Sequence, residues 1–329
     1  MQLFLTYDYE LFFGEPTGTV EKCIIEPTNL LREISKKHQV FYTFFVDVGY
    51  LKQLQLLKDQ YPKVAEEYQL VKTQIDQLVA EGHDCQLHIH PHWEDCSHDG
   101  EKWNMITDRY KLDDFSDEDI ERIVLEYAQI LTQWTGKAVH TYRAGGWCLQ
   151  PFERVQKAFS KIGIKYDTTV FPGGKFTAGN YYYDFTNCPN KSKWQFNSDL
   201  CKAEENGEFW EYPISNYNYS PLFFWRLFIL GRLKPKQHKP IGDGYPMASP
   251  GLRKKMLTKG MNLSAAVDGY FVTKLGAVVR KNQRKGFEET VILGHPKACT
   301  HFALRKLDQF IAKHKNNHQF LTFSDLVKE

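Results

Sequence analysis

The residues best suited to chemistry in this chain are three histidines within five positions, His88, His90 and His92. Neutral imidazole is the commonest metal ligand among side chains, and it titrates near physiological pH. The histidines follow Cys85-Gln86-Leu87, which has the pattern of a buried strand, and Pro91 should end that strand because proline donates no backbone hydrogen bond. The pattern predicts a metal site at the carboxyl end of a strand. The alternative is a structural or surface histidine cluster.

Two carboxylates follow the first apolar stretch of the chain. Residues 3–10 read as a short strand, and Asp8 and Glu10 are two positions apart, so they face the same side of an extended chain. In a close pair of carboxylates, one can serve as a metal ligand and the other as a general base. The alternative is a polar strand end that caps the next loop.

Three further polar side chains stand at predicted strand ends. A strand at 139–143 delivers Arg143, a strand at 164–167 delivers Asp167, and a β-branched strand at 290–293 is followed by Gly294 and His295. Polar groups at successive strand ends are what an α/β active site requires. From the residues alone, a structural ion pair for Arg143 and a strand-end cap for His295 are the favoured interpretations.

The elements that must position these residues alternate between strand and helix. Apolar periodicity predicts helices from Pro27, over 61–80, over 116–136, over 151–162 and over 301–313, and a buried strand at 40–46. This order indicates an α/β fold with a parallel sheet or barrel. Residues 171–284 interrupt the alternation with an aromatic-rich insertion, in which 261–279 is predicted to be helical. We expect one domain over 1–329 that contains this insertion.

The ordered set of motifs resembles the polysaccharide deacetylases of carbohydrate esterase family 4. The resemblance rests on Thr6-Tyr7-Asp8-Tyr9-Glu10, on His88 and His92, on Arg143 with Gly145-Gly146-Trp147, on Asp167, and on Leu293-Gly294-His295-Pro296. It implies a distorted (β/α)7 barrel and metal-assisted removal of an acetyl group from a sugar. Tyr9 is a departure, because the family usually has a metal-binding aspartate at that position. The same-face neighbour Glu10 can replace it.

The resemblance also implies roles for individual residues. Glu10, His88 and His92 would hold a divalent metal, most simply Zn²⁺, with Co²⁺, Ni²⁺ or Fe²⁺ as alternatives. Asp8 would be the general base, although the roles of Asp8 and Glu10 can be exchanged. His295 would protonate the leaving group, Arg143 would fix the base, and Asp167 would orient His295. Trp147 is expected to form a wall of the substrate pocket, and His90 is an extra imidazole near it that could exchange roles with a neighbour.

Composition and cysteine usage limit the functional class of the protein and its cellular compartment. A formal net charge of +2 with 25% charged residues argues against a dedicated nucleic-acid binder. The seven cysteines include no Cys-x-x-Cys pair, which favours free thiols in a reducing compartment. No signal peptide precedes the first strand, and no 18-residue apolar run occurs. We therefore expect a cytoplasmic protein.

Residues 221–230 are almost wholly apolar, and Arg232, Lys234, Lys236 and Lys239 follow them. The favoured interpretation is a buried helix followed by a solvated basic loop. The alternative is an interfacial helix that makes a peripheral membrane contact through 221–239, at the inner membrane face.

The function that these observations favour is a cytoplasmic hydrolase that removes an acetyl group, preferably N-acetyl, from a surface-polysaccharide precursor. The substrate would be an acetylated sugar or oligosaccharide, free or linked to a lipid or nucleotide. One alternative is a metal-independent glycoside hydrolase that uses two carboxylates on a related barrel. The other alternative is a catalytically inactive carbohydrate-binding protein. The presence of Tyr9, where the family usually has a metal-binding aspartate, supports this alternative.

Overall fold

The computed structural model describes residues 1–247 and 251–327, and these divide into two compact units. The first unit comprises Met1–Phe41 and Ile214–Leu321, and the second comprises Tyr42–Pro213 and Thr322–Glu329. The predicted insertion at 171–284 is therefore shared between the units. That the whole chain is one domain stays a prediction.

The second unit is built on a mainly parallel sheet with the strand order β10-β11-β7-β6-β3-β2. Neighbouring strands run parallel except β10 and β11, which are antiparallel. β2 carries Phe44, Phe45 and Val46, all fully buried, as expected for a parallel strand covered on both faces. The strands are β2 (Thr43–Asp47), β3 (Asp84–Ile89), β6 (Thr141–Ala144), β7 (Tyr166–Asp167), β10 (Trp194–Phe196) and β11 (Phe209–Glu211).

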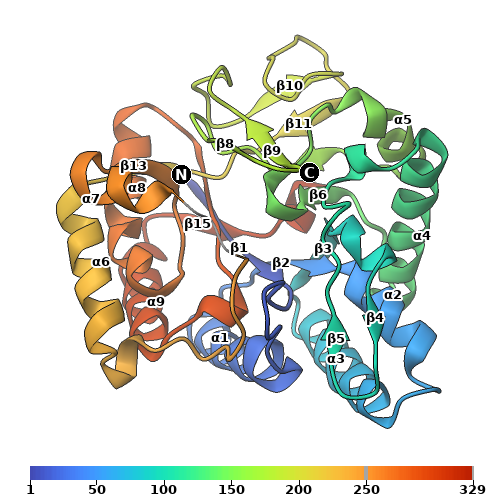
Figure 1. Ribbon diagram of the computed structural model, residues 1–329. Helices are drawn as coiled ribbons and strands as arrows, with labels where there is room; N and C mark the ends of the chain where they lie inside the picture. The colour runs from blue at the N-terminus through green and yellow to red at the C-terminus, as the bar shows by residue number, and fades with distance from the viewer. Residues whose placement is uncertain (248–250, 328–329) are drawn as a thin grey trace. The chain divides into compact units, whose positions relative to one another are not determined.

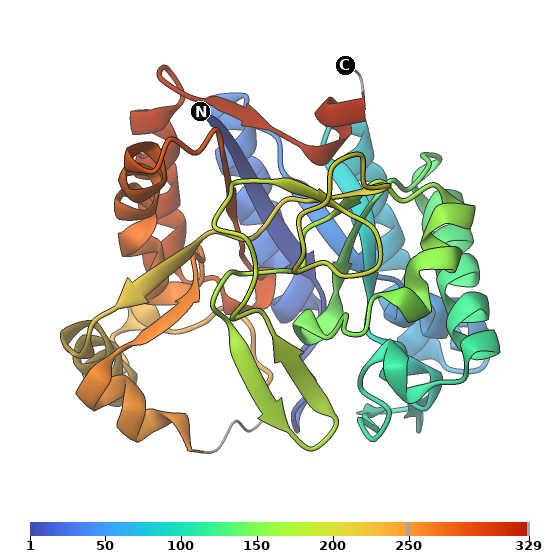
Figure 2. The ribbon, with the colours of Figure 1, turned by 90° about the horizontal axis from the view of Figure 1, so that it is seen from above.

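Helices connect β2 to β3, β3 to β6 and β6 to β7, which are parallel neighbours in the sheet. Ser116 caps one of them, α4, by accepting a hydrogen bond from the Asp119 amide, as its position before an acidic turn predicts. The helices are α2 (Val48–Leu57), α3 (Pro62–Ala80), α4 (Asp117–Thr135) and α5 (Glu153–Ile162). Two short antiparallel pairs complete the unit, β4 (Ser97–His98) with β5 (Trp103–Asn104) and β8 (Lys175–Ala178) with β9 (Tyr181–Asp184). The second pair stands out as a hairpin in Figure 2.

The first unit is organised around β1 (Gln2–Tyr9), which pairs in parallel with both β14 (Glu289–Ile292) and β15 (Gln319–Leu321). An antiparallel pair, β12 (Asn216–Tyr219) with β13 (Met261–Ser264), lies in the same unit. Its helices are α1 (Glu26–His38), α6 (Pro221–Leu233), α7 (Leu252–Lys259), α8 (Leu275–Arg284) and α9 (His301–His314). Figure 1 shows α6 and α7 beside one another.

Two sequence predictions are wrong. Residues 261–279 do not form one α-helix: Met261–Ser264 is strand β13, Gly269–Lys274 is a 3-10 helix, and the α-helix α8 begins only at Leu275. Pairing with β12 decides this, because tertiary hydrogen bonds outweigh weak local propensity. The expectation that all cysteines are free also fails, since Cys188 and Cys201 form a disulfide. The cysteine argument for a reducing compartment therefore falls away, although five cysteines are free.

Within the described parts of the chain, no helix combines the length and the apolar character needed to cross a membrane.

Candidate active site

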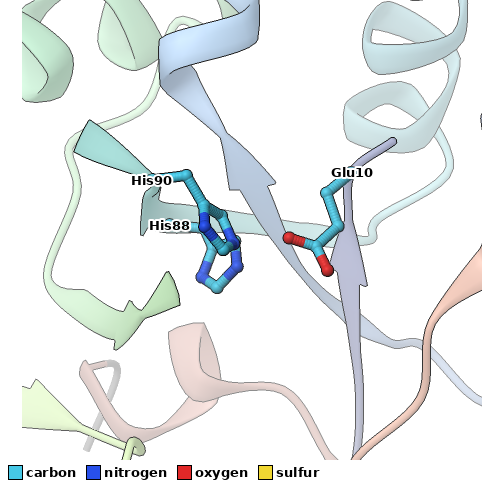
Figure 3. A group of neighbouring side chains, drawn as sticks. All are labelled: Glu10, His88 and His90. Atoms are coloured by element: carbon cyan, nitrogen blue, oxygen red, sulfur yellow. The ribbon is translucent and has the colours of Figure 1, made fainter. Parts of the chain in front are cut away.

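His88 and His90 form a buried imidazole pair at the carboxyl end of β3. Their ring centroids are 4.8 Å apart, and Figure 3 shows the two rings next to one another at the end of this strand. His88 Nδ1 lies 2.8 Å from the carbonyl oxygen of Arg143, its partner on β6. A carbonyl only accepts, so Nδ1 must carry the proton and Nε2 presents its lone pair. This tautomer is the one in which a metal-binding histidine is held by its outer shell.

His92 has a different environment from the other two histidines. Pro91 opens a 3-10 turn (Pro91–Glu94), and the turn places the buried His92 ring parallel to Tyr110, at a centroid distance of 5.5 Å. The sequence prediction paired His88 with His92. The pair whose ring nitrogens lie within 4.8 Å of one another, as a shared ion requires, is His88 with His90. Strand alternation explains this, because residues two apart share a face.

Gly145 allows His90 to lie against the backbone that follows β6. A Cβ at Gly145 would come 2.5 Å from His90 Nδ1, so only glycine fits. Trp147, two residues on, has a φ of +63°, a strained value for a bulky residue of the kind found at functional sites. The half-buried Trp147 ring packs against Phe171 and Tyr183. Its role as a wall of the substrate pocket stays a prediction.

In the first unit, Asp8 and Glu10 lie with His295 in a second group of possible ligands. Their oxygen and nitrogen atoms are all within 4.8 Å of one another, and both carboxylates are buried. Nε2 of His295 is 3.6 Å from Asp8 Oδ2 and 3.8 Å from Glu10 Oε1. The parallel pairing of β1 with β14 brings the two strand ends together, and the Asp8 amide donates to the Gly294 carbonyl at 2.9 Å.

Lys297 adds a cation to this group that the sequence analysis did not single out. Its Nζ is 2.9 Å from Glu10 Oε1 and also donates to the carbonyl of Leu11 at 2.6 Å. The side chain is nearly buried and passes the rings of Phe12 and Phe13. Glu10 therefore has a fixed positive partner. No sequence signal marked Lys297 beyond its position two residues after His295.

Asp268 is the carboxylate that holds His295. Its Oδ2 is 2.7 Å from His295 Nδ1, and its Oδ1 accepts the His295 backbone amide at 2.8 Å. Burial alone would lower the pKa of His295, but the charges of Asp268, Asp8 and Glu10 outweigh it and raise that pKa to about 9. The imidazole is therefore protonated at neutral pH, with Nε2–H turned to Asp8 and Glu10.

The role predicted for Asp167 is thereby corrected, because Asp268 occupies the Nδ1 position that Asp167 was expected to fill. Asp268 escaped the sequence analysis because the stretch around it was interpreted as helix. Its only signal was its place at the end of the apolar run Ala265-Ala266-Val267.

Asp167 belongs instead to a buried network in the second unit. It accepts hydrogen bonds from the Thr169 amide at 2.9 Å and from Thr169 Oγ1 at 2.8 Å. The parallel register of β7 and β11 sets Glu211 directly beside it. Arg143 donates from Nε to the Thr168 carbonyl at 3.0 Å, and its guanidinium lies over the ring of Phe45 at 4.2 Å. Arg143, Asp167 and Glu211 are all essentially excluded from water.

One proton is shared between these two carboxyl groups. Burial raises the pKa of Glu211 well above its usual value, and the neighbouring Asp167 charge raises it further. Burial raises the pKa of Asp167 as well, but hydrogen bonds from Glu211 and Thr169 and the Arg143 charge oppose it. Glu211 is neutral and donates to an ionised Asp167.

Glu211 was also missed by the sequence analysis, although a signal existed. In the strand Phe209-Trp210-Glu211, Phe209 and Glu211 share a face, and Phe209 is buried. A carboxyl group on the buried face of an apolar strand is rare unless it has a partner.

Comparison with known proteins supports the fold. No protein-family model matches the chain, and no curated protein matches its sequence. A candidate polysaccharide deacetylase from Mycobacterium smegmatis superposes with a TM-score of 0.55 at 14% identity, over 99% of this chain and 88% of that one. A second candidate polysaccharide deacetylase, from Pseudomonas aeruginosa PAO1, superposes with a TM-score of 0.53 at 11% identity, over 99% of this chain and 89% of that one. PuuE allantoinase superposes with a TM-score of 0.53 at 12% identity, over 99% of this chain and 89% of that one.

The chain therefore has the α/β fold of the polysaccharide deacetylases, and the resemblance seen in the motifs is confirmed at the level of fold. Likeness at this identity does not transfer an activity or a substrate.

Proposed function

We propose that the protein is a metal-dependent hydrolase that removes an acetyl group, preferably N-acetyl, from a sugar of a surface-polysaccharide precursor. The observation that carries the proposal is the His88–His90 pair, buried at a strand end of a deacetylase fold with His88 held in the metal-binding tautomer. Buried imidazoles with an oriented Nε2 are rarely needed for packing alone.

The donors fit a divalent ion of the zinc class. Two imidazoles and one carboxylate leave coordination positions open for water and substrate, which is the composition of catalytic rather than structural zinc sites. We assign His88 and His90 as the imidazole ligands and Glu10 as the carboxylate, with His92 as the alternative to His90. When bound, the ion would polarise the acetyl carbonyl and acidify the attacking water.

The remaining residues supply proton transfer. Asp8 accepts the proton of the attacking water. We assign this role to Asp8 rather than Glu10, because an oxygen of Glu10 is already engaged by the Lys297 ammonium at 2.9 Å. His295, protonated and fixed through Nδ1 by Asp268, donates its Nε2 proton to the leaving amine or alkoxide. Arg143 positions the base through its fixed guanidinium, and Trp147 bounds the sugar pocket.

The substrate proposal is an acetylated sugar or oligosaccharide, free or attached to a nucleotide or lipid, and we place the reaction in the cytoplasm. The aromatic side chains around Trp147 suit stacking on sugar faces.

Metal content tests the ligand assignment. The purified protein, stripped and reloaded with Zn²⁺, should retain about one ion per chain by plasma mass spectrometry. His88→Ala and His90→Ala should lose most of it, whereas His92→Ala should keep it. Loss in His92→Ala with retention in His90→Ala would return the second ligand to His92. Full retention in both His88→Ala and His90→Ala, with loss in His295→Ala, would move the ion to the Asp8–Glu10–His295 group and overturn the assignment.

Product analysis tests the reaction. The zinc-loaded protein with N-acetylated oligosaccharides should release acetate, and Asp8→Asn should abolish release while keeping the metal. Reducing sugar without acetate would indicate a glycoside hydrolase. Allantoin belongs in the assay because an allantoinase shares the fold. Sugar binding without any product would leave an inactive carbohydrate-binding protein.

A further inference from the structure

Helix α6 exposes an apolar stripe in the first unit. Leu222, Trp225, Ile229 and Leu233 recur every three or four residues, which places them on one helix face. They are 61%, 47%, 49% and 73% exposed. We call these four residues the α6 stripe. The opposite face buries Phe223 and Phe224 against a hydrophobic cluster that includes Tyr219 and Phe271. The prediction of a buried helix is therefore wrong for the exposed face of α6.

The chain around the α6 stripe is strongly basic. Residues 221–240 and 251–264 contain no aspartate or glutamate. Their arginines and lysines are all exposed: Arg226, Arg232, Lys234, Lys236, Lys239, Arg253, Lys254, Lys255 and Lys259. The total charge of the chain is nearly balanced, so these residues form a local excess of cations around the α6 stripe.

Helix α7 holds its cations beside the stripe. The indole Nε1 of Trp225 donates to the Leu257 carbonyl at 3.1 Å. From α7, the guanidinium of Arg253 lies over the ring of Phe228 at 4.4 Å, and from α6 Arg232 lies over the same ring at 5.1 Å. The apolar stripe and the cations of both helices thus belong to one surface of the first unit.

We propose that the α6 stripe docks on an anionic lipid surface, with its apolar side chains entering the acyl boundary and the cations of α6 and α7 contacting headgroups. Interfacial helices combine these two features. A helix of 13 residues is too short to span a bilayer but can lie in its plane. This inference is independent of the proposed hydrolysis.

Charge and apolar character favour a lipid surface over two other partners, a second copy of the chain and a nucleic acid. A second copy of the chain would bring nine cations against nine, because a two-fold interface pairs a surface with itself. A nucleic acid would satisfy the cations but would leave the aliphatic side chains of Leu222, Ile229 and Leu233 without an apolar partner. Only an anionic lipid surface offers both phosphate charge and hydrocarbon.

Vesicle sedimentation tests the proposal with the whole chain. The protein should bind vesicles of phosphatidylcholine with 30% phosphatidylglycerol and bind pure phosphatidylcholine far less. Binding should weaken as salt rises, because exposed charges are screened. Lys234→Gln/Lys254→Gln should weaken binding by about fivefold per removed charge. Leu222→Ser/Ile229→Ser/Leu233→Ser should weaken it by at least about a hundredfold.

Matched variants on other surfaces serve as controls. Leu56→Ser/Ile106→Ser/Leu125→Ser removes three exposed apolar side chains from the second unit, and Lys313→Gln/Lys315→Gln removes two exposed cations at the C-terminal end of α9. Both should bind vesicles like the wild type. The proposal is overturned if the wild type ignores anionic vesicles at low salt, or if stripe and control variants bind alike. It is also overturned if the stripe variant instead converts a dimer to a monomer in light scattering.

Discussion

Two aspartates in this molecule each hold another titratable group, with opposite consequences for where the proton sits. Asp268 lies against an imidazole and, together with the charges of Asp8 and Glu10, raises the pKa of His295 to about 9, so that the pair is ionic. Asp167 lies against a second carboxyl group and keeps Glu211 protonated, so that the pair carries one negative charge opposite Arg143.

The difference shows that the neighbour, rather than the aspartate, decides the electrostatics of each strand end. An anion stabilises an adjacent cation and destabilises an adjacent anion. One arrangement stores a proton that can be donated at Nε2 of His295. The Asp167–Glu211 pair carries one negative charge, which holds the Arg143 guanidinium in a site from which water is excluded.

The largest expected effect comes from removing both carboxyl groups around Arg143. Asp167→Asn/Glu211→Gln leaves the buried guanidinium without either acid of its network, and should lower the free energy of unfolding by about 3–5 kcal/mol. Each single variant should cost much less, because the remaining carboxyl group can ionise in place of the lost one. Urea denaturation of all four proteins measures this.

The coupling between the two sites is the decisive quantity. If the cost of the double variant equals the sum of the single costs, the two acids act independently, and the shared-proton description fails.

Asp268→Asn should have the next largest effect. Without its anionic partner, the pKa of His295 in the metal-free protein should fall from about 9 toward the ordinary value near 6.5. A raised folded-state pKa stabilises the protein fully below the unfolded pKa, and this contribution is lost as pH rises through 9. The variant should therefore be less stable by about 2 kcal/mol at pH 6 and nearly equal to the wild type at pH 10.

Histidine NMR titration and denaturation at the two pH values measure these changes. Asp167→Asn is the matched control and should leave the His295 titration in place. A His295 pKa that responds to Asp167→Asn and not to Asp268→Asn would reverse the comparison.

Glu211→Gln should give the smallest effect and the most specific one. Glutamine keeps the shape of a protonated glutamate and still donates to Asp167. The folded wild type holds this proton above the pH at which the unfolded chain releases it, so its stability falls with rising pH through that window. The variant has no such proton, and its stability relative to the wild type should rise by about 1 kcal/mol or more between pH 5 and pH 8. Parallel stability curves for the two proteins would mean that Glu211 is ionised in the folded state.

Much of the fold and part of the site could be predicted from sequence, because the signals are local. The apolar runs of β2 and β3, the Ser116 cap of α4 and the alternation of strand and helix each depend on neighbours in the chain. Strand periodicity likewise places Asp8 with Glu10. The same periodicity puts His88 and His90 on one face, whereas the family resemblance pairs His88 with His92.

What the sequence by itself determined is which residue types stand at the strand ends: carboxylates at the end of β1, histidines at the end of β3, Arg143 on β6, and His295 after β14. Only the tertiary structure decided the partners. Asp268 binds His295 from 27 positions away, and Glu211 meets Asp167 through the register of β7 with β11. The strand pairs that create such contacts are chosen by burial and backbone hydrogen bonding over the whole fold, which no local pattern encodes.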